Sequence, residues 1–185
     1  MIFRIVFVTI ILILVISSAA SAENLQALKL EIPKTSWEPI YFETINKRTR
    51  EASLRDLRTT QLEKGSVEIR IWIGFGLSWL EGIILTRENG KSEVRHIPAE
   101  YVTKIFKYSK PKSGWENFWR MLLNKKIYRL PDSSTITDYK NVFDGVSYVV
   151  EYNREGHYRT YQYNNPKYQT CPEAKQILNL SLIHI

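Results

Sequence analysis

Alternating apolar and polar residues predict a β-hairpin over residues 144–166. Valine or tyrosine recurs at every second position along both arms, at Val146, Tyr148, Val150, Tyr152, Tyr161 and Tyr163. This period of two places alternate side chains on one half-buried face of a strand. Residues 153–156 would connect the arms, since Gly156 can adopt the positive φ that such loops often require.

A second set of strands is predicted in the first half of the chain. The clearest strand covers residues 66–76, followed by a strand at 79–87, an Asn89-Gly90 turn and a return arm at 92–97. Alternation over 66–76 places Val67, Ile69, Ile71, Ile73 and Phe75 on one face and Glu68, Arg70 and Trp72 on the other. These segments predict a three-stranded antiparallel meander.

The helical period is clearest over residues 115–125. Apolar residues fall at i, i+3, i+4 and i+7, namely Trp115, Phe118, Trp119 and Leu122. Residues 172–178 are typical of the first turns of a further helix, with Pro172 at an early position. Because strands outnumber helices and neighbours pair as hairpins, we expect an α+β fold. It would be a curved antiparallel β-sheet built from hairpins, with one amphipathic helix packed on a face.

Two regions are ambiguous. Residues 42–61 are charged and rich in threonine, and Leu54 and Leu57 fit a short helix as well as a strand at 53–59. Residues 100–112 fit either element. We therefore expect residues 23–60 to be an N-terminal lead-in and residues 61–179 to be the α+β domain.

The N-terminus has the pattern of a secretory signal peptide over residues 1–22. Arg4 precedes an apolar run at 5–16, and Ala20-Ser21-Ala22 fits a cleavage site. The run is shorter than the roughly 20 residues of a membrane span, which disfavours the alternative of an uncleaved anchor. We expect a mature chain that starts at Glu23 and is periplasmic or secreted, with no stable membrane span after cleavage.

Charge and cysteine content limit the partners. The whole chain carries a net charge of +7, and Arg4 supplies one of these charges, which leaves +6 after residue 22. In an exported protein this balance favours anionic envelope surfaces over nucleic acid, although solubility alone also explains it. Cys171 is the only cysteine, so the sequence excludes an internal disulfide.

Candidates for catalysis are few: Glu151, Asp144 and His157. Glu151 lies in the middle of a predicted strand and would act as an acid or base if it faced a cleft. The alternative is a cross-strand pair with Arg159 or Lys140. His96 and His157 lack the ligand spacing of a metal site, and glycine-rich and serine-nucleophile motifs are incomplete or absent, so we expect neither a metal nor a cofactor.

Aromatic and basic residues alternate on the second arm of the hairpin. Tyr158, Arg159 and Tyr161 can form an open face that binds a ligand or partner, or the tyrosines can pack beneath the helix. The first possibility predicts an exported, non-enzymatic domain that binds an envelope component or a protein partner. The alternatives are a cell-wall or polysaccharide hydrolase that uses Glu151, and an accessory module of a longer protein.

The order of motifs is similar to that of small exported bacterial proteins of uncharacterised function. The motifs are E-I-R-I-W-I-G-F-G at 68–76, W-x-x-L-L at 119–123, D-G-x-x-Y-x-x-E at 144–151 and Y-R-x-Y-x-Y-x-N-P at 158–166. The resemblance implies a small exported domain and assigns no catalytic residue. Separately, L-S-L-I-H-I at 180–185 resembles a translated transposon adapter from sequencing libraries. We therefore expect 180–185 to be an artefact and the α+β domain to be truncated near Asn179.

Overall fold

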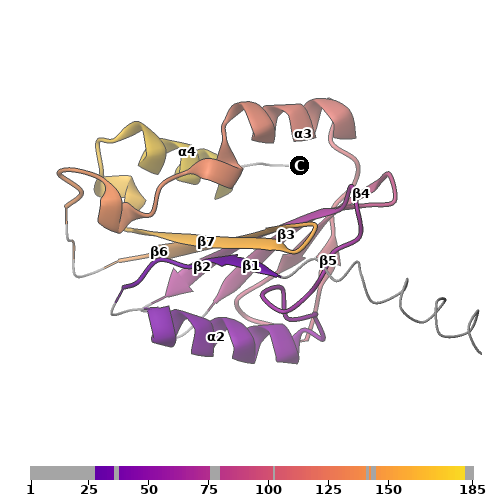
Figure 1. The fold of residues 1–185 in the computed structure, drawn as a ribbon, viewed down its shortest axis with the longest axis horizontal. Coiled ribbons are helices and arrows are strands. Elements are labelled where there is room, and N and C mark those ends of the chain that lie inside the picture. The colour runs from indigo at the N-terminus through magenta and orange to yellow at the C-terminus, as the bar shows by residue number, and fades with distance from the viewer. Residues whose placement is uncertain are drawn as a thin grey trace, which may run out of the picture.

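The computed structural model describes residues 28–35, 38–75, 80–101, 103–140, 142 and 145–181. Within these residues the fold is α+β: seven strands form one open, mixed sheet, with helices on both of its faces (Figure 1). The strand order is β1-β7-β6-β2-β3-β4-β5. The strands are β1 (Lys29–Glu31), β2 (Val67–Phe75), β3 (Glu81–Glu88), β4 (Lys91–Ile97), β5 (Phe106–Lys107), β6 (Ser147–Arg154) and β7 (His157–Asn164). The helices are α2 (Glu38–Glu51), α3 (Trp115–Asn124) and α4 (Pro172–Ser181), and the short 3-10 turns are η1 (Ile127–Arg129), η2 (Ser133–Thr135) and η3 (Pro166–Tyr168).

Both predicted hairpins form. Strands β3 and β4 are antiparallel around Asn89-Gly90, whose φ angles of 50° and 74° suit a tight two-residue turn. Strands β6 and β7 are also antiparallel, but their loop is Glu155-Gly156 rather than residues 153–156. The strands are longer than predicted because Asn153 stays in the ladder and accepts a hydrogen bond from the Gly156 amide. Strand β2 lies between β3 and β6, antiparallel to both.

The sheet is mixed rather than wholly antiparallel. Strand β1 runs parallel to β7, with Lys29 in register with His157 and Glu31 with Arg159. This strand comes from the segment expected to be a lead-in. The same segment also forms α2, which covers the face of the sheet opposite α3 and α4 (Figure 1). The short helix suggested around Leu54 is instead a longer helix that ends before it.

The sheet therefore has a buried cluster on each face. On the α3 face, Phe118, Trp119 and Leu122 pack against the sheet as the helical period predicted. On the α2 face, Ile45 packs with Trp72. Other buried members include Ile69, Ile71, Ile73, Leu85, Val94, Val150, Tyr161, Tyr163, Ala174 and Ile177 on the α3 face, and Ile84, Ile97 and Val149 on the α2 face. The helix predicted at 115–125 and the start of a helix predicted at 172–178 both form, as α3 and α4, and α2 is the covering helix that was not expected.

In the described part of the chain, no helix has the length and apolar character needed to cross a membrane. The predicted signal peptide at 1–22 lies outside the described residues.

Candidate functional site

Glu151 lies on the α2 face of β6 and is almost fully buried, with 1 % of its surface exposed. Its Oε2 accepts a hydrogen bond from Trp72 Nε1 at 2.7 Å, and its Oε1 accepts one from the Tyr158 hydroxyl at 2.9 Å. Both donor residues are themselves fully buried. The carboxylate therefore satisfies two internal donors and does not face a cleft.

The neighbours of Glu151 across the sheet differ from those expected from the sequence. Its register partners are Arg70 on β2 and Thr160 on β7. Arg159, one expected partner, points to the opposite face of β7 because strand side chains alternate. Lys140, the other, lies before β6 and outside this pairing. The expected pair with Arg159 or Lys140 is therefore wrong.

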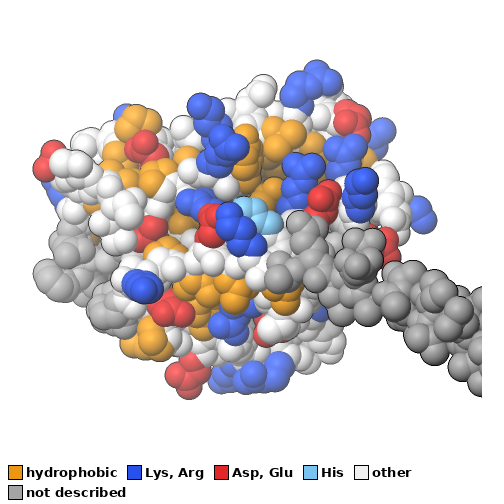
Figure 2. Space-filling view, viewed as in Figure 1, with side chains coloured by type: hydrophobic (Ala, Val, Ile, Leu, Met, Phe, Trp, Pro, Cys, Tyr) orange, Lys and Arg blue, Asp and Glu red, His pale blue; other side chains and the backbone are white. Residues whose placement is uncertain are grey.

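The other two catalytic candidates do not join Glu151. Asp144 lies outside the described residues. His157 stands at the start of β7, where its Nε2 lies 3.0 Å from Glu31 Oε1. Glu31 also pairs with Lys29 at 2.8 Å and with Arg159 at 3.6 Å. Hydrogen bonds to Lys29 and then His157 lower the pKa of Glu31. In the view of Figure 2, a histidine lies with basic and acidic side chains over the region of β1 and β7. Glu31 offsets part of the positive charge of its three partners.

Tyr158, Arg159 and Tyr161 do not form one open face. Tyr158 is 0 % and Tyr161 1 % exposed, and the two rings lie on opposite sides of the sheet. The Tyr161 hydroxyl donates to the Ile127 carbonyl at 2.8 Å, and Arg159 Nη2 donates to the Leu130 carbonyl at 2.6 Å. Burial raises the pKa of Tyr161. These side chains hold the segment after α3 onto the sheet, which is the packing alternative that the sequence left open.

A buried ionic group lies beside Glu151 on the same face. Glu68 and Arg70 are 0 % and 1 % exposed, and Glu68 Oε1 accepts from Arg70 Nε at 2.7 Å. Arg55 donates to the other oxygen of Glu68 and also pairs with Glu88. Burial tends to raise the pKa of Glu68, but Arg70 and Arg55 together outweigh it, and the pKa is lowered. This group explains how the polar face of β2 is buried under α2.

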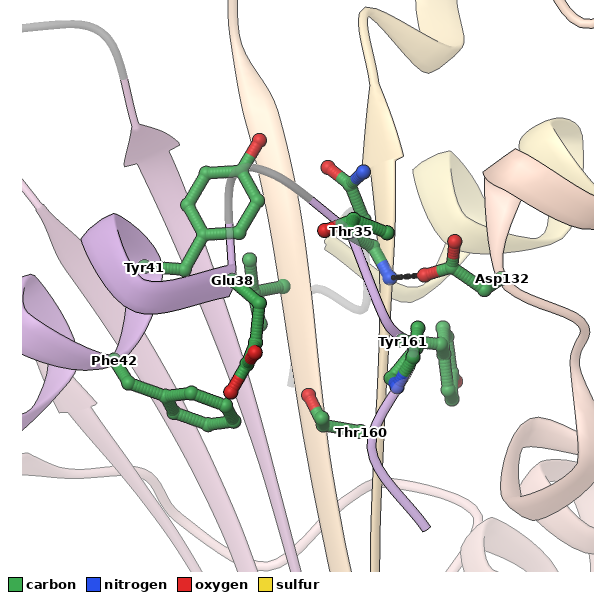
Figure 3. A pocket seen from close by; sticks show the side chains of 10 residues that line it. Thr35, Glu38, Tyr41, Phe42, Asp132, Thr160 and Tyr161 are labelled. Atoms are coloured by element: carbon green, nitrogen blue, oxygen red, sulfur yellow. Dashed lines mark hydrogen bonds between the residues drawn. The ribbon is translucent and has the colours of Figure 1, made fainter.

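A small pocket, partly open to solvent, lies between the start of α2 and β7 (Figure 3). Glu38 and Asp132 line it, together with Thr160. Asp132 Oδ2 accepts from the Gln162 amide at 2.8 Å, the dashed line in Figure 3, and its Oδ1 accepts from the Ser134 amide at 3.0 Å. Both oxygens of Asp132 are thus used to cap η2 and the edge of β7. This carboxylate holds the sheet edge in place and is not poised as an acid or base.

Metal binding has no support in the residues that the structure describes, since they contain no group of three or more histidine, cysteine, aspartate or glutamate side chains able to hold an ion.

Exposed aromatic and basic side chains gather instead at the far edge of the sheet, around β5. Three large rings there are exposed to between 40 % and 47 %, and four lysines lie between and after them. We call this the β5 surface, made of Tyr101, Lys104, Phe106, Lys107, Tyr108, Lys110 and Lys112. Residues 101–115 contain no aspartate or glutamate. Large exposed apolar side chains in one place mark an interaction site more often than scattered ones do.

The rings of the β5 surface are held at angles to one another. Tyr101 and Phe106 make an edge contact, with centroids 6.5 Å apart and planes 62° apart. The Lys104 ammonium lies 4.5 Å from the centre of the Tyr101 ring, a cation–π distance. Tyr108 stacks on His96 with centroids 5.9 Å apart. Lys104 and His96 therefore each lie against an aromatic ring, which mixes charge and apolar area within one surface.

Two elements position the β5 surface. Strand β5 pairs antiparallel with β4, and the Tyr108 amide extends this pairing by donating to the Val94 carbonyl at 3.0 Å. The buried Arg48 of α2 donates hydrogen bonds through Nη2 to the carbonyls of Pro98 at 2.6 Å and Tyr101 at 2.8 Å. The turn that leads into β5 is thus fixed by a helix from the N-terminal segment.

No family model, curated protein or solved structure matches this chain, so its function is argued from its own residues. Sequence reasoning missed the β5 surface because residues 100–112 fit a helix as well as a strand, so no exposed face could be assigned. The signal was present in a different form, as three aromatic residues and four lysines without an acidic residue.

Proposed function

We propose that this protein is an exported, non-catalytic protein that binds an anionic component of the cell envelope through the β5 surface. The observation that carries the proposal is the set of three exposed rings and four lysines in an acid-free segment at the edge of the sheet. Such a surface offers both positive charge and apolar contact area.

The lysines of the β5 surface differ from the other clustered charges of the molecule. At the β1 edge, Lys29, His157 and Arg159 all lie within 4.0 Å of the Glu31 carboxylate, which offsets part of their positive charge. Within the described residues, Lys107 is the one lysine of the β5 surface with a carboxylate within 4.0 Å, that of Glu93 at 2.7 Å. The charges of Lys104, Lys110 and Lys112 therefore remain available to an anionic ligand.

The competing proposal of a hydrolase has less support. It rested on Glu151, whose burial and two internal hydrogen bonds leave no path to a substrate. The envelope as the place of action rests on the signal peptide predicted at 1–22. An accessory module of a longer protein would use the same surface.

The test compares two charge-reversed proteins. The triple variant Lys104→Glu, Lys107→Glu, Lys110→Glu alters the β5 surface, and a control triple variant changes three exposed lysines elsewhere by the same total charge. The control lysines are Lys34, Lys64 and Lys167. Each protein is sedimented with isolated cell envelopes. We expect the first variant to bind at least on the order of tenfold more weakly than the control variant, because like charges now face the ligand. Equal binding by both variants would refute the proposed function.

A further inference from the structure

The anionic ligand can be specified further from the chemistry of the β5 surface. From residue 103 to residue 113 the side chains are exposed, except for half-buried Ile105 and buried Pro111. Phe106 is 47 % exposed, with Tyr101 and Tyr108 on either side at 43 % and 40 %. Aromatic rings with lysines beside them are the composition of segments that lie at a membrane–water interface.

The arrangement of the rings disfavours a polysaccharide. A sugar ring needs an open, flat aromatic face to stack on. The planes of Tyr101 and Phe106 differ by 62°, so these neighbours do not form one platform. One face of Tyr101 lies under the Lys104 ammonium, and one face of Tyr108 lies against His96. Rings that present their edges can instead insert between lipid headgroups, with the tyrosine hydroxyls remaining in the polar layer.

The type of basic residue agrees with a membrane surface. The β5 surface uses lysines, which act as mobile point charges, whereas arginine forms the planar, paired hydrogen bonds of a specific phosphate site. The nearest arginine on β4, Arg95, is directed to Glu93, with its Nε 3.2 Å from the carboxylate. Lysines on long stems suit a fluid layer of phosphates whose positions are not fixed.

Resting on the function proposed above, we propose that the β5 surface binds the anionic phospholipid surface of a bilayer. Phe106 enters the headgroup layer, with Tyr101 and Tyr108 beside it. The ammonium groups of Lys104, Lys110 and Lys112 lie above it, against the phosphates. Strand pairing with β4 and the Arg48 anchor fix the backbone that presents these side chains.

The experiment uses the protein recovered from the exported fraction of cells that express the full chain. It is sedimented with vesicles of phosphatidylcholine alone and of phosphatidylcholine with phosphatidylglycerol. We expect binding to the anionic vesicles only, and less binding at high salt because salt screens the attraction. Equal binding to both kinds of vesicle would overturn the inference.

Matched variants separate the charged from the apolar contribution. A triple variant, Lys104→Gln, Lys110→Gln, Lys112→Gln, should lower the partition coefficient on the order of 100-fold, since each lysine near an anionic surface contributes about fivefold. The same change at Lys34, Lys64 and Lys167 is the control, and an equal loss in that control would contradict the inference.

For the apolar contribution, Phe106→Ser should lower binding about fivefold, because the half of the ring that is exposed in solution no longer inserts. Leu123→Ser is its control, since Leu123 is 52 % exposed on α3. Equal effects of these two substitutions would show that Phe106 does not enter the bilayer.

A soluble anionic polysaccharide, polygalacturonate, provides the remaining comparison. Binding to polygalacturonate or to whole envelopes without binding to anionic vesicles would overturn the lipid inference and leave the proposed function intact. Failure to bind vesicles, polygalacturonate and envelopes alike would overturn both.

Discussion

From the contacts of Glu151 we predict that the effect of Tyr158→Phe on the unfolding free energy changes sign when Glu151 is also replaced. Glu151 accepts hydrogen bonds from Trp72 and from Tyr158, and all three side chains are buried. Replacement by leucine removes both acceptors and leaves two buried donors unpaired. Replacement by glutamine keeps an acceptor oxygen for Trp72. The glutamine amide N–H can donate a hydrogen bond to the Tyr158 oxygen.

The magnitudes follow from the number of donors left unpaired. A buried polar group without a partner costs about 1–3 kcal/mol, so Glu151→Leu should lower the unfolding free energy by about 2–6 kcal/mol. Glu151→Gln leaves only the Tyr158 O–H without its acceptor, so it should cost about 1–3 kcal/mol, less than Glu151→Leu. Both changes keep the side-chain volume roughly constant, which limits the contribution of altered packing.

Tyr158→Phe is the second change. In the natural protein it removes a donor from Glu151 and should lower the unfolding free energy by about 1–2 kcal/mol. In the Glu151→Leu protein it removes a hydroxyl that has lost its acceptor, so it should stabilise that protein by about 1 kcal/mol. Urea unfolding followed by tryptophan fluorescence measures the free energy of unfolding of the natural protein, Glu151→Leu, Tyr158→Phe and the double variant. A destabilising effect of Tyr158→Phe in both backgrounds would refute the assignment of Glu151 as the acceptor that satisfies these donors.

Two further predictions concern the same face of the sheet. Gly82→Ala should lower the unfolding free energy by about 1–3 kcal/mol, because an added Cβ would lie 2.7 Å from Cζ3 of the fully buried Trp72; unchanged stability in urea would contradict this close contact. Glu68 has a folded-state pKa below its ordinary value of 4.5. The unfolded chain therefore binds more protons than the folded chain near pH 4.5. Glu68 thus contributes stability above pH 4.5, and this stability is lost as the pH falls through the lower, folded-state pKa. Thermal unfolding from neutral to acidic pH should therefore show a smaller acid loss for Glu68→Gln than for the natural protein, and parallel curves would refute the lowered pKa.

The sequence predicted the hairpins and α3 well because their signals are local. Alternation marks β2 and β6, and Asn89-Gly90 supplies the positive φ angles of one turn. The period of α3 includes three buried residues on one face. In each case a short window of residues contains the whole pattern.

The sequence did not predict α2, because the inner face of this helix is only partly apolar. Phe42 and Ile45 are followed on that face by Arg48 and Thr49, which are buried as well. Arg48 is suited to this position because the carbonyls of Pro98 and Tyr101 accept its hydrogen bonds. Those acceptors lie about fifty residues away in the sequence, so no local pattern could indicate them.

The candidate site was mistaken for a related reason. Tyr158 and Tyr161 were correctly placed on one strand, but the burial of both faces of that strand depends on α2 and on the segment after α3. Glu68 and Arg70 of β2 are polar, and no local pattern indicates that their face of the strand is covered. They are buried because they pair with each other and with Arg55.

The parallel pairing of β1 with β7 has a consequence for the order of folding. Lys29 near the beginning of the described chain aligns with His157 near its end, and the Gln61 side chain donates to the Glu155 carbonyl of the same hairpin. Contacts between such distant segments raise the contact order and slow folding. If the chain is exported, as proposed above, β1 has no partner strand until the β6–β7 hairpin has also crossed the membrane. The N-terminal segment would thus remain unfolded throughout translocation, the state that passage through a narrow channel requires.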